Sequence, residues 1–234
     1  MAYSGYEDYF SKEVIISVAT TGGHHGKEAN PNLPTQPEEV ARDIQACEEA
    51  GASMVHLHAR DDDGENTKDI TRYQELRDRI EEYCDDIIVN FTTGGGGIYS
   101  REERIAPCLE TEPRPEVATV DLGPVNFGQT RTAVNTREQN EEYAERMREA
   151  GVKHELELFN PGHIPEAEHL IDEGLLDDPY WATVIFGMQN GMPASPGNLV
   201  TFVENLPDPV EWQCLAVGKH QLPMTTMAMA MGGH

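Results

Sequence analysis

Two histidines two residues apart are the side chains best suited to chemistry in this chain. His56 and His58 end an apolar run at residues 52–55, which predicts a β-strand. Side chains alternate between the faces of a strand, so both imidazoles point the same way, and Arg60 with them. Two imidazoles on one face are suitable metal ligands. Spacing alone leaves two interpretations open: a metal site, or a solvated strand end that happens to hold two histidines.

Carboxylates form a second candidate group. Glu155 and Glu157 share one face of another predicted strand. Carboxylates inside a barrel are costly unless they are paired or used. Near a metal, one of them could be a third ligand or a general base, and otherwise the two would take part in a salt bridge.

Hydroxyl groups and bare backbone follow the next strands. Thr92 and Thr93 precede Gly94, the first of four glycines, and Thr119 and Asp121 lie near the end of a later strand. Hydroxyls and free N–H groups in such a loop could hold a carboxylate or a phosphate. The alternative is a flexible loop without a ligand.

The elements that must position these groups alternate between strand and helix. Helical patterns begin at residues 35, 70, 137, 165 and 196, the first with Thr35 as N-cap and Glu38 as its capping-box partner. Residues 224–231 (MTTMAMAM) are expected to form a further helix that packs in the core. Steps near thirty residues between strands indicate βα units and a parallel sheet. In an α/β barrel, reactive groups lie at the carboxyl ends of the strands, where all the groups above are found. Strands are predicted at residues 14–20, 52–58, 87–92, 117–122, 153–159, 182–186 and 211–217.

Length and order together predict one domain. We assign residues 1–234 to a single (β/α)8 TIM barrel of the α/β class, with about seven βα units present. The first βα turn has no G-x-G-x-x-G fingerprint, which argues against a dinucleotide-binding fold. An eighth strand and helix are missing from the pattern, so we expect the chain to be truncated at its C-terminus.

Charge and cysteine content limit the compartment and the partners. The chain has 42 acidic against 17 basic residues and a formal charge of −25, which disfavours nucleic acid and anionic membranes. The acidic residues are scattered, as is typical of a salt-adapted protein, although an ordinary acidic protein is the alternative. The four separated cysteines suggest reduced thiols. Residues 1–13 do not resemble a signal peptide, so we expect a cytoplasmic protein.

Several motifs in fixed order resemble the β-keto acid cleavage enzymes, typified by the 3-keto-5-aminohexanoate cleavage enzyme. The similarity runs nearly end to end, and the combination is specific although no single motif is. The motifs are residues 19–22 (ATTG), 31–39 (PNLPTQPEE), 49–52 (EAGA), 56–61 (HLHARD), 92–95 (TTGG), 118–119 (AT), 126–128 (NFG), 155–157 (ELE) and 231–234 (MGGH).

The resemblance implies a Zn2+-dependent (β/α)8 barrel, usually a homotetramer, with acyltransferase-type activity. The family converts a β-keto acid and acetyl-CoA into acetoacetate and a new CoA ester. Its two strand histidines, which ligate the metal, fall on His56 and His58. Its contacts to the substrate carboxylate fall on Thr92, Gly94 and Thr119, and a supporting glutamate falls on Glu157. With these we predict Thr93 as substrate-binding, and Glu157 and Arg60 as catalytic.

Two departures from the family pattern matter. In the family, an arginine, a third metal-binding glutamate and an aspartate follow the Gly-Gly-His segment, whereas this sequence ends at His234. Catalytic zinc normally takes three protein ligands, so two predict poor metal retention. His24 replaces the acid that meets the substrate amino group, which favours a β-keto acid other than the aminated one.

Two alternatives remain at this point. One is another metal-dependent barrel enzyme, such as an amidohydrolase-type hydrolase; that type carries its H-x-H pair on the first strand and a histidine on the sixth, whereas here the pair is on the second. The other is an inactive fragment that lacks the third metal ligand.

Overall fold

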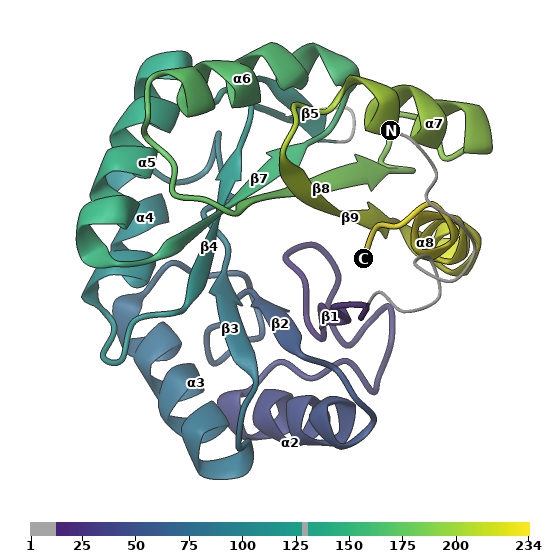
Figure 1. The fold of residues 1–234 in the computed structure, drawn as a ribbon. Coiled ribbons are helices and arrows are strands. Elements are labelled where there is room, and N and C mark those ends of the chain that lie inside the picture. The colour runs from purple at the N-terminus through teal and green to yellow at the C-terminus, as the bar shows by residue number, and fades with distance from the viewer. Residues whose placement is uncertain (1–12, 128–130) are drawn as a thin grey trace.

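Seven parallel strands form one curled sheet at the centre of the molecule (Figure 1). The computed structural model describes residues 13–127 and 131–234. Residues 1–12, on which the expectation of no signal peptide rests, and Gly128 of the NFG motif lie outside them. In spatial order the strands are β1 (Ser17–Val18), β2 (Met54–Leu57), β3 (Ile88–Phe91), β4 (Val117–Asp121), β7 (Lys153–Leu158), β8 (Tyr180–Phe186) and β9 (Val210–Ala216).

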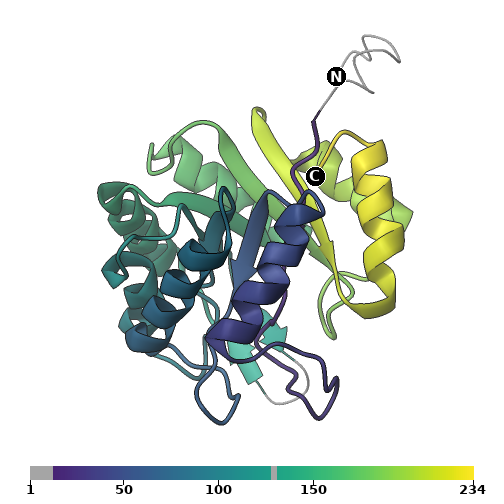
Figure 2. The ribbon, with the colours of Figure 1, turned by 90° about the horizontal axis from the view of Figure 1, so that it is seen from below.

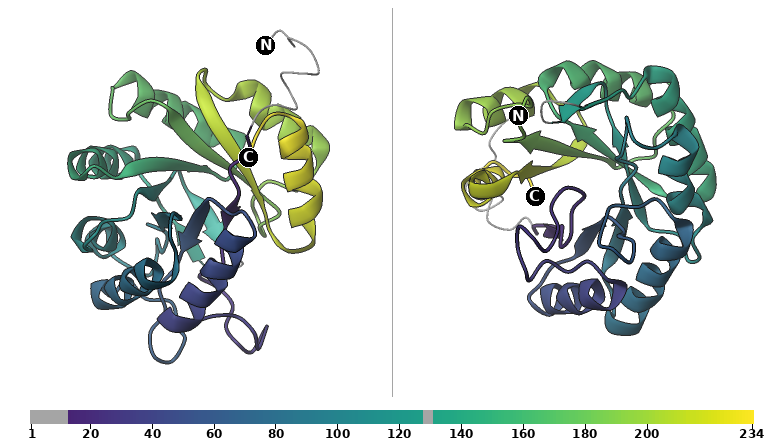
Figure 3. Two further views of the ribbon diagram at one scale, coloured as in Figure 1. Left: turned by 60° about the horizontal axis from the view of Figure 1, so that its bottom comes forward. Right: turned by 180° about the vertical axis from the view of Figure 1, so that it is seen from behind.

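Helices surround the sheet on its outer side (Figures 1 and 3). The predicted α/β barrel is therefore confirmed as a curled, incomplete (β/α)8 barrel. The helices are α2 (Pro37–Glu49), α3 (Ile70–Tyr83), α4 (Arg101–Glu110), α5 (Arg137–Ala150), α6 (Ile164–Asp172), α7 (Pro196–Asn205) and α8 (Gln221–Ala230), with single 3-10 turns η1 (Pro161–His163) and η2 (Gly218–His220).

Local sequence signals explain most helix ends. The side chain of Thr136 caps the start of helix α5, and the helix is followed by Gly151, which adopts the left-handed conformation that favours glycine. At α2 the predicted cap was wrong by one residue: Gln36 is the N-cap, and Glu39 accepts from the backbone N–H groups of Thr35 and Gln36. The reason is that Pro37 at the first helical position fixes where the helix begins.

The sequence patterns missed one helix and one hairpin. Helix α4 starts at a capping box formed by Ser100 and Glu103, but Pro107 lies inside it and obscures its pattern. The short antiparallel strands β5 (Val125–Phe127) and β6 (Arg131–Ala133) follow β4. Both elements are too short or too irregular to show a clear periodicity.

The two edges of the sheet, β1 and β9, approach each other around His234 (Figure 1). His234 donates its N–H to Trp212 O and accepts from Cys214 N, both at 3.0 Å, which is the pattern of a parallel strand beside β9. On its other side, His234 Nδ1 accepts from Ile15 N at 2.8 Å. His234 therefore occupies the place where an eighth strand would begin, although no such strand is among the described residues.

Alternation along the strands separates an apolar layer from a polar one. Val55 and Leu57 of β2 and Phe91 of β3 pack with helix residues in the main core. The residues between them face the other side, where Asn90 is fully buried. The barrel interior is thus lined by polar side chains, although such interiors usually hold branched apolar residues.

The structure also bears on the thiols and on membranes. Among the described residues, Cys108 and Cys214 are buried, Cys47 and Cys84 are half-buried, and all four are free thiols. No described helix is long and apolar enough to cross a membrane.

Candidate active site

The carboxyl ends of β2, β3, β4 and β7 bring the predicted groups to one end of the barrel. His56 on β2 lies in register with Asn90 on β3, and Asp121 on β4 lies in register with Glu157 on β7. The loops that follow β1 and β2 and the β5–β6 hairpin lie at this same end (Figure 2). Parallel strand ends and three connecting segments therefore enclose one polar region, as in other α/β barrels.

The two predicted metal ligands face one another. His56 Nε2 and His58 Nε2 are 3.3 Å apart, with the rings tilted by 66°. Desolvation by burial lowers the pKa of both imidazoles, and that of His58 falls well below its ordinary value. Neutral imidazoles keep a lone pair for a metal ion, so both rings are in the state that a metal ligand requires.

The spacing of these nitrogens suits a tetrahedral metal ion. Two nitrogens bound to zinc at about 2.0–2.1 Å with tetrahedral angles lie about 3.3 Å apart. A third ligand does not join them: within residues 13–127 and 131–234, no group of three His, Cys, Asp or Glu side chains could hold a metal ion. The residues present therefore fit two positions of a zinc site, and Glu157 is not placed as a third ligand.

Asp121 and Glu157 form a carboxyl pair at the same end. Burial raises the pKa of Glu157 well above its usual value, and the nearby Asp121 and Glu155 carboxylates and a hydrogen bond with Asp121 raise it further. Two adjacent carboxyl groups resist ionising together, and this favours the protonated form of Glu157. A carboxyl group that favours its protonated form can serve as a general acid and, once it has given up the proton, as a base.

The threonine–glycine segment is locked to its neighbours by hydrogen bonds. Thr93 Oγ1 donates to Thr119 O at 2.8 Å, and Thr93 N donates to Thr119 Oγ1 at 3.0 Å. Gly94 N donates to Thr92 Oγ1 at 2.9 Å, which leaves the Thr92 hydroxyl proton to be directed elsewhere. Thr93 and Thr119 therefore shape this segment, and Thr92 is the hydroxyl best placed to meet a ligand.

Gly94 keeps the region in front of the carboxyl pair open. A Cβ at this position would come 2.9 Å from Thr92 Oγ1 and 3.9 Å from Asp121 Oδ2. Any side chain here would therefore force the Thr92 hydroxyl to move. The structure thus requires a glycine at this position, and the substrate-binding role of Gly94 stays a prediction.

Arg60 holds a loop. Its guanidinium donates to Gly22 O at 2.7 Å, to His25 O at 2.8 Å and to Gly64 O at 2.9 Å. These bonds join the loops after β1 and β2, and Arg60 is buried. The arrangement favours a loop-positioning role over the predicted catalytic one, because all three guanidinium nitrogens are directed to carbonyls.

Two buried residues that the sequence analysis did not single out also belong to the site. Lys68 Nζ donates to Thr92 O at 2.5 Å, and burial lowers the pKa of Lys68 from 10.5 to about 8. The Asn90 amide raises the pKa of His56 against the larger effect of burial. Asn90 could have been found by alternation, because it lies two residues before Thr92, whereas a lysine at the end of a polar loop carries no such signal.

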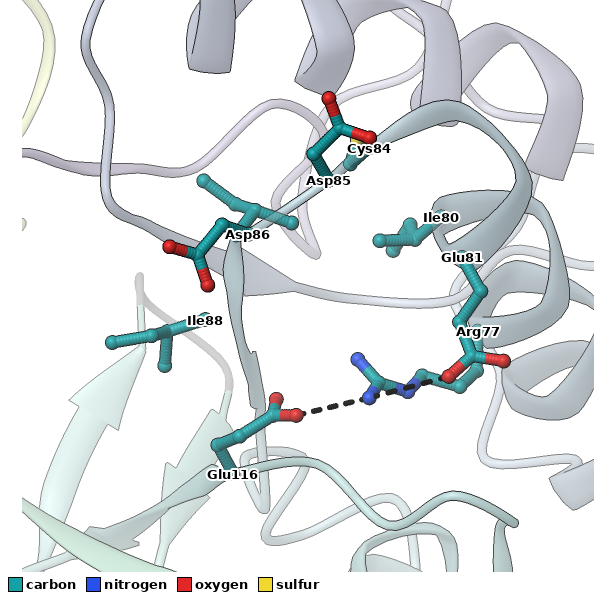
Figure 4. Close-up of a pocket in the computed structure, with 9 residues that line it drawn as sticks. Arg77, Ile80, Glu81, Cys84, Asp85, Asp86, Ile88 and Glu116 are labelled. Atoms are coloured by element: carbon teal, nitrogen blue, oxygen red, sulfur yellow. Dashed lines mark hydrogen bonds and ion pairs between the residues drawn. The ribbon is translucent and has the colours of Figure 1, made fainter.

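A surface hollow of about 490 Å³ lies at the opposite end of the barrel and contains none of the predicted site residues. Figure 4 shows Arg77 of α3 reaching across it to Glu116, at 2.9 Å. The second oxygen of Glu116 accepts a hydrogen bond from Val89 N of β3. This ion pair links helix α3 to the start of β4 at the amino ends of the strands. That end of a barrel generally serves stability.

Known sequences match nearly the whole chain. A model of the family described as beta-keto acid cleavage enzyme matches residues 13–234. The 3-keto-5-aminohexanoate cleavage enzyme of Fusobacterium nucleatum is 38% identical over 223 residues, which are 95% of this chain and 80% of that protein. The 3,5-dioxohexanoate:acetyl-CoA acetone transferase of Paraburkholderia graminis is 29% identical, over 95% of this chain and 80% of its own.

A solved structure supports the fold. The apo structure of ObcA superposes with a TM-score of 0.75 at 20% sequence identity. The match covers 86% of this chain and 54% of that one, so this chain spans about half the length of ObcA. At this identity the similarity concerns the barrel alone.

Proposed function

We propose that this chain, which belongs to the beta-keto acid cleavage enzyme family, condenses a β-keto acid with acetyl-CoA to give acetoacetate and a new acyl-CoA. Membership of this family shows that the chain is an enzyme, and its relatives are named as cleavage enzymes and acetyl-CoA transferases. Zinc dependence, the substrate and the roles of single residues are our proposals. The family match over residues 13–234 excludes the alternative of an amidohydrolase-type hydrolase.

One observation carries the proposal: the histidine pair lies at the same polar end of the barrel as the Asp121–Glu157 carboxyl pair. His56 Nε2 and His58 Nε2 are separated as two ligands of a tetrahedral zinc ion would be. A bound zinc ion would polarise the ketone oxygen of the β-keto acid as a Lewis acid. The nearby Asp121–Glu157 pair supplies a proton acceptor and a donor.

The threonine–glycine segment would hold the substrate carboxylate. The Thr92 hydroxyl points its oxygen to Gly94 N, so its proton can be donated to a carboxylate oxygen. Lys68 brings a positive charge to the carbonyl of Thr92. A fixed donor and a nearby cation favour an anionic group, the more so because Thr92 and Lys68 are both buried. Thr93 and Thr119 support this position through their mutual bonds.

The carboxyl pair moves the proton that the reaction requires. The Asp121–Glu157 pair accepts a proton from the α-carbon of the β-keto acid, and that carbon then bonds to the thioester carbonyl of acetyl-CoA as CoA thiolate leaves. The thiolate attacks the former ketone carbon, and the bond from that carbon to the α-carbon breaks. The pair then returns the proton to the α-carbon of acetoacetate.

The loop after β1 bears on the substrate class. Desolvation lowers the pKa of His24, and Arg131 and Arg60 lower it further. A neutral imidazole near two cations is a poor partner for an ammonium group. We therefore propose a β-keto acid without an amino group, in contrast to the substrate in the name of the Fusobacterium relative.

The test is a product assay with labelled acetyl-CoA. The purified chain is loaded with zinc in concentrated KCl and given 3-keto-5-aminohexanoate, 3,5-dioxohexanoate or 3-oxoadipate. Acetyl-CoA labelled with ¹³C in both acetyl carbons should give acetoacetate labelled in its methyl and ketone carbons only. Absence of labelled acetoacetate with every substrate, with zinc bound, would overturn the proposal; removal of zinc with dipicolinate is the matched control.

Three further properties belong to the same proposal. We propose a single barrel domain over residues 1–234, a cytoplasmic protein adapted to high salt, and a homo-oligomer, specifically a homotetramer. The strongly exposed Leu222 and the exposed Met229 on the outer face of α8 favour association, since apolar side chains gain from being covered.

A further inference from the structure

The buried residue Glu155 lies at the centre of a hydrogen-bond network that spans four strands. Asn90 Nδ2 of β3 and Thr183 Oγ1 of β8 both donate to it, and Gln213 Nε2 of β9 donates at 2.8 Å. Gln213 Nε2 also donates to Thr183 Oγ1 at 2.8 Å. The hydrogen bonds that reach Glu155 from described residues are all donated to it, as a carboxylate requires.

A structural role alone does not explain this layer of the barrel. Glu155 is 2% exposed and Asn90 is fully buried, at positions where barrels usually carry branched apolar residues. Burying a carboxylate is unfavourable even when it is hydrogen-bonded, and apolar side chains of similar size often stabilise such positions as well or better. A requirement other than stability therefore accounts for a carboxylate here.

The network fixes the orientation of one amide. A carboxylate only accepts, so the Asn90 side chain must turn its nitrogen toward Glu155 and its Oδ1 away. Asn90 Oδ1 is buried and has no hydrogen-bond partner among the described residues. The register partner of Asn90 on the neighbouring strand β2 is His56, so the two side chains lie on the same face of the sheet.

The orientation of His56 leaves one ring nitrogen for Asn90. His56 Nε2 faces His58 Nε2 at 3.3 Å, so Nδ1 is the remaining nitrogen. If Nδ1 carries the proton and donates to Asn90 Oδ1, the lone pair stays on Nε2, where a metal ion would bind.

We propose that Glu155 is a positioning residue that acts through Asn90 to hold His56 in the Nδ1–H tautomer, ready to bind a metal through Nε2. This inference rests on the proposed function for its purpose, but the tautomer can be measured without metal. The two glutamates of β7 would then have different roles: Glu157 would move protons, and Glu155 would orient a metal ligand.

The test measures the tautomer of His56 by long-range ¹H–¹⁵N NMR on the metal-free chain, with the His56→Gln variant used for assignment. We expect the Nδ1–H form in the wild type and a mixture of both tautomers in Glu155→Leu and in Asn90→Leu. The double variant, which restores an apolar pair, should show no larger change than Asn90→Leu alone. An Nε2–H form in the wild type, or unchanged tautomers in the variants, would overturn the inference.

A matched control separates positioning from general loosening. Thr183→Val removes a donor to the other oxygen of Glu155 and should leave the His56 tautomer unchanged, whatever its effect on stability. An equal change in this variant would count against the inference. If Glu155→Leu does not fold, Glu155→Gln takes its place: its amide can donate to Asn90 Oδ1 as well as accept from Nδ2, so it no longer fixes the Asn90 amide and should also give a mixture of His56 tautomers.

Metal affinity gives the second readout. Loss of a partner that orients a metal-binding histidine typically weakens binding about 10–100-fold, so the Kd for Co2+ should rise by that factor in Asn90→Leu and Glu155→Leu, and by less than about 3-fold in Thr183→Val. Unchanged affinity in the first two would contradict the inference. A wild type with the expected tautomer but no metal binding and no acetoacetate would refute the proposed function and leave the positioning role standing.

Discussion

The backbone of Gly23 lies against the imidazole of His58: a Cβ on Gly23 would come 2.8 Å from His58 Nδ1 and 3.0 Å from Cε1. The contact joins the loop after β1 to the end of β2. Arg60 holds this loop from the other side through the carbonyl of Gly22. The position of one predicted metal ligand therefore depends on a loop more than thirty residues away in the sequence.

Replacing Gly23 with alanine should weaken metal binding, because the added methyl group must displace either His58 or the loop. We expect the Kd for zinc to rise about 10-fold. Competition with a chromogenic chelator measures this value. Gly197→Ala is the control, since its Cβ would meet nothing within 4 Å. Equal zinc affinity in both variants would show that the loop does not position His58.

Glu157→Gln should strongly reduce turnover and yet stabilise the fold at high pH. The folded-state pKa of Glu157 is raised, so the folded protein keeps a proton that the unfolded chain releases, and stability falls as the pH rises above about 4.5. Glutamine removes this loss. We expect activity to fall about 10²–10⁴-fold, and Tm at pH 8 to rise by roughly 2–4 °C for each kcal/mol regained.

Thermal unfolding of Glu157→Gln from pH 5 to pH 8 measures the effect. The exposed Glu149 on α5 offers a control, since Glu149→Gln removes a charge without removing a buried proton. A Tm difference from wild type that does not grow with pH would contradict the raised pKa.

Lys68→Met should remove a pH dependence from stability. Burial lowers the pKa of Lys68 from 10.5 to about 8, so between these values the folded state has lost a proton that the unfolded state still binds. Wild-type stability should therefore gain a contribution as pH rises through this window, of about 3 kcal/mol at most. Denaturant unfolding at pH 8 and pH 10.5 measures it, with the exposed Lys219→Met as control. Equal pH slopes in wild type and Lys68→Met would exclude the effect.

Arg60→Lys tests whether Arg60 positions a loop or takes part in the reaction. A lysine has one ammonium group and cannot reach the three carbonyls that the guanidinium binds. We expect KM for the β-keto acid to rise about 10-fold with kcat changed less than about 3-fold, the sign of lost binding. Steady-state kinetics with labelled acetyl-CoA provide both constants. A collapse of kcat with unchanged KM would instead support the catalytic role that the sequence predicts.

Strand periodicity carried most of the sequence prediction. It placed His56 and His58 on one face of their strand, and Glu155 and Glu157 on one face of a different strand, because alternation is a local property of the backbone. The same rule would have added Asn90. It failed for helix α4, where a capping box is followed by an internal proline, and for the two short strands of the β5–β6 hairpin.

The sequence by itself determined the parallel barrel, the face that the two histidines share and the family of the chain. All three depend on periodicity and motif order, which are read along one chain. The tertiary structure alone decided which distant groups meet. The register of β4 against β7 brings Asp121 to Glu157, and the path of the loop after β1 brings Gly23 to His58. These contacts depend on packing between separate segments, and local patterns do not specify it.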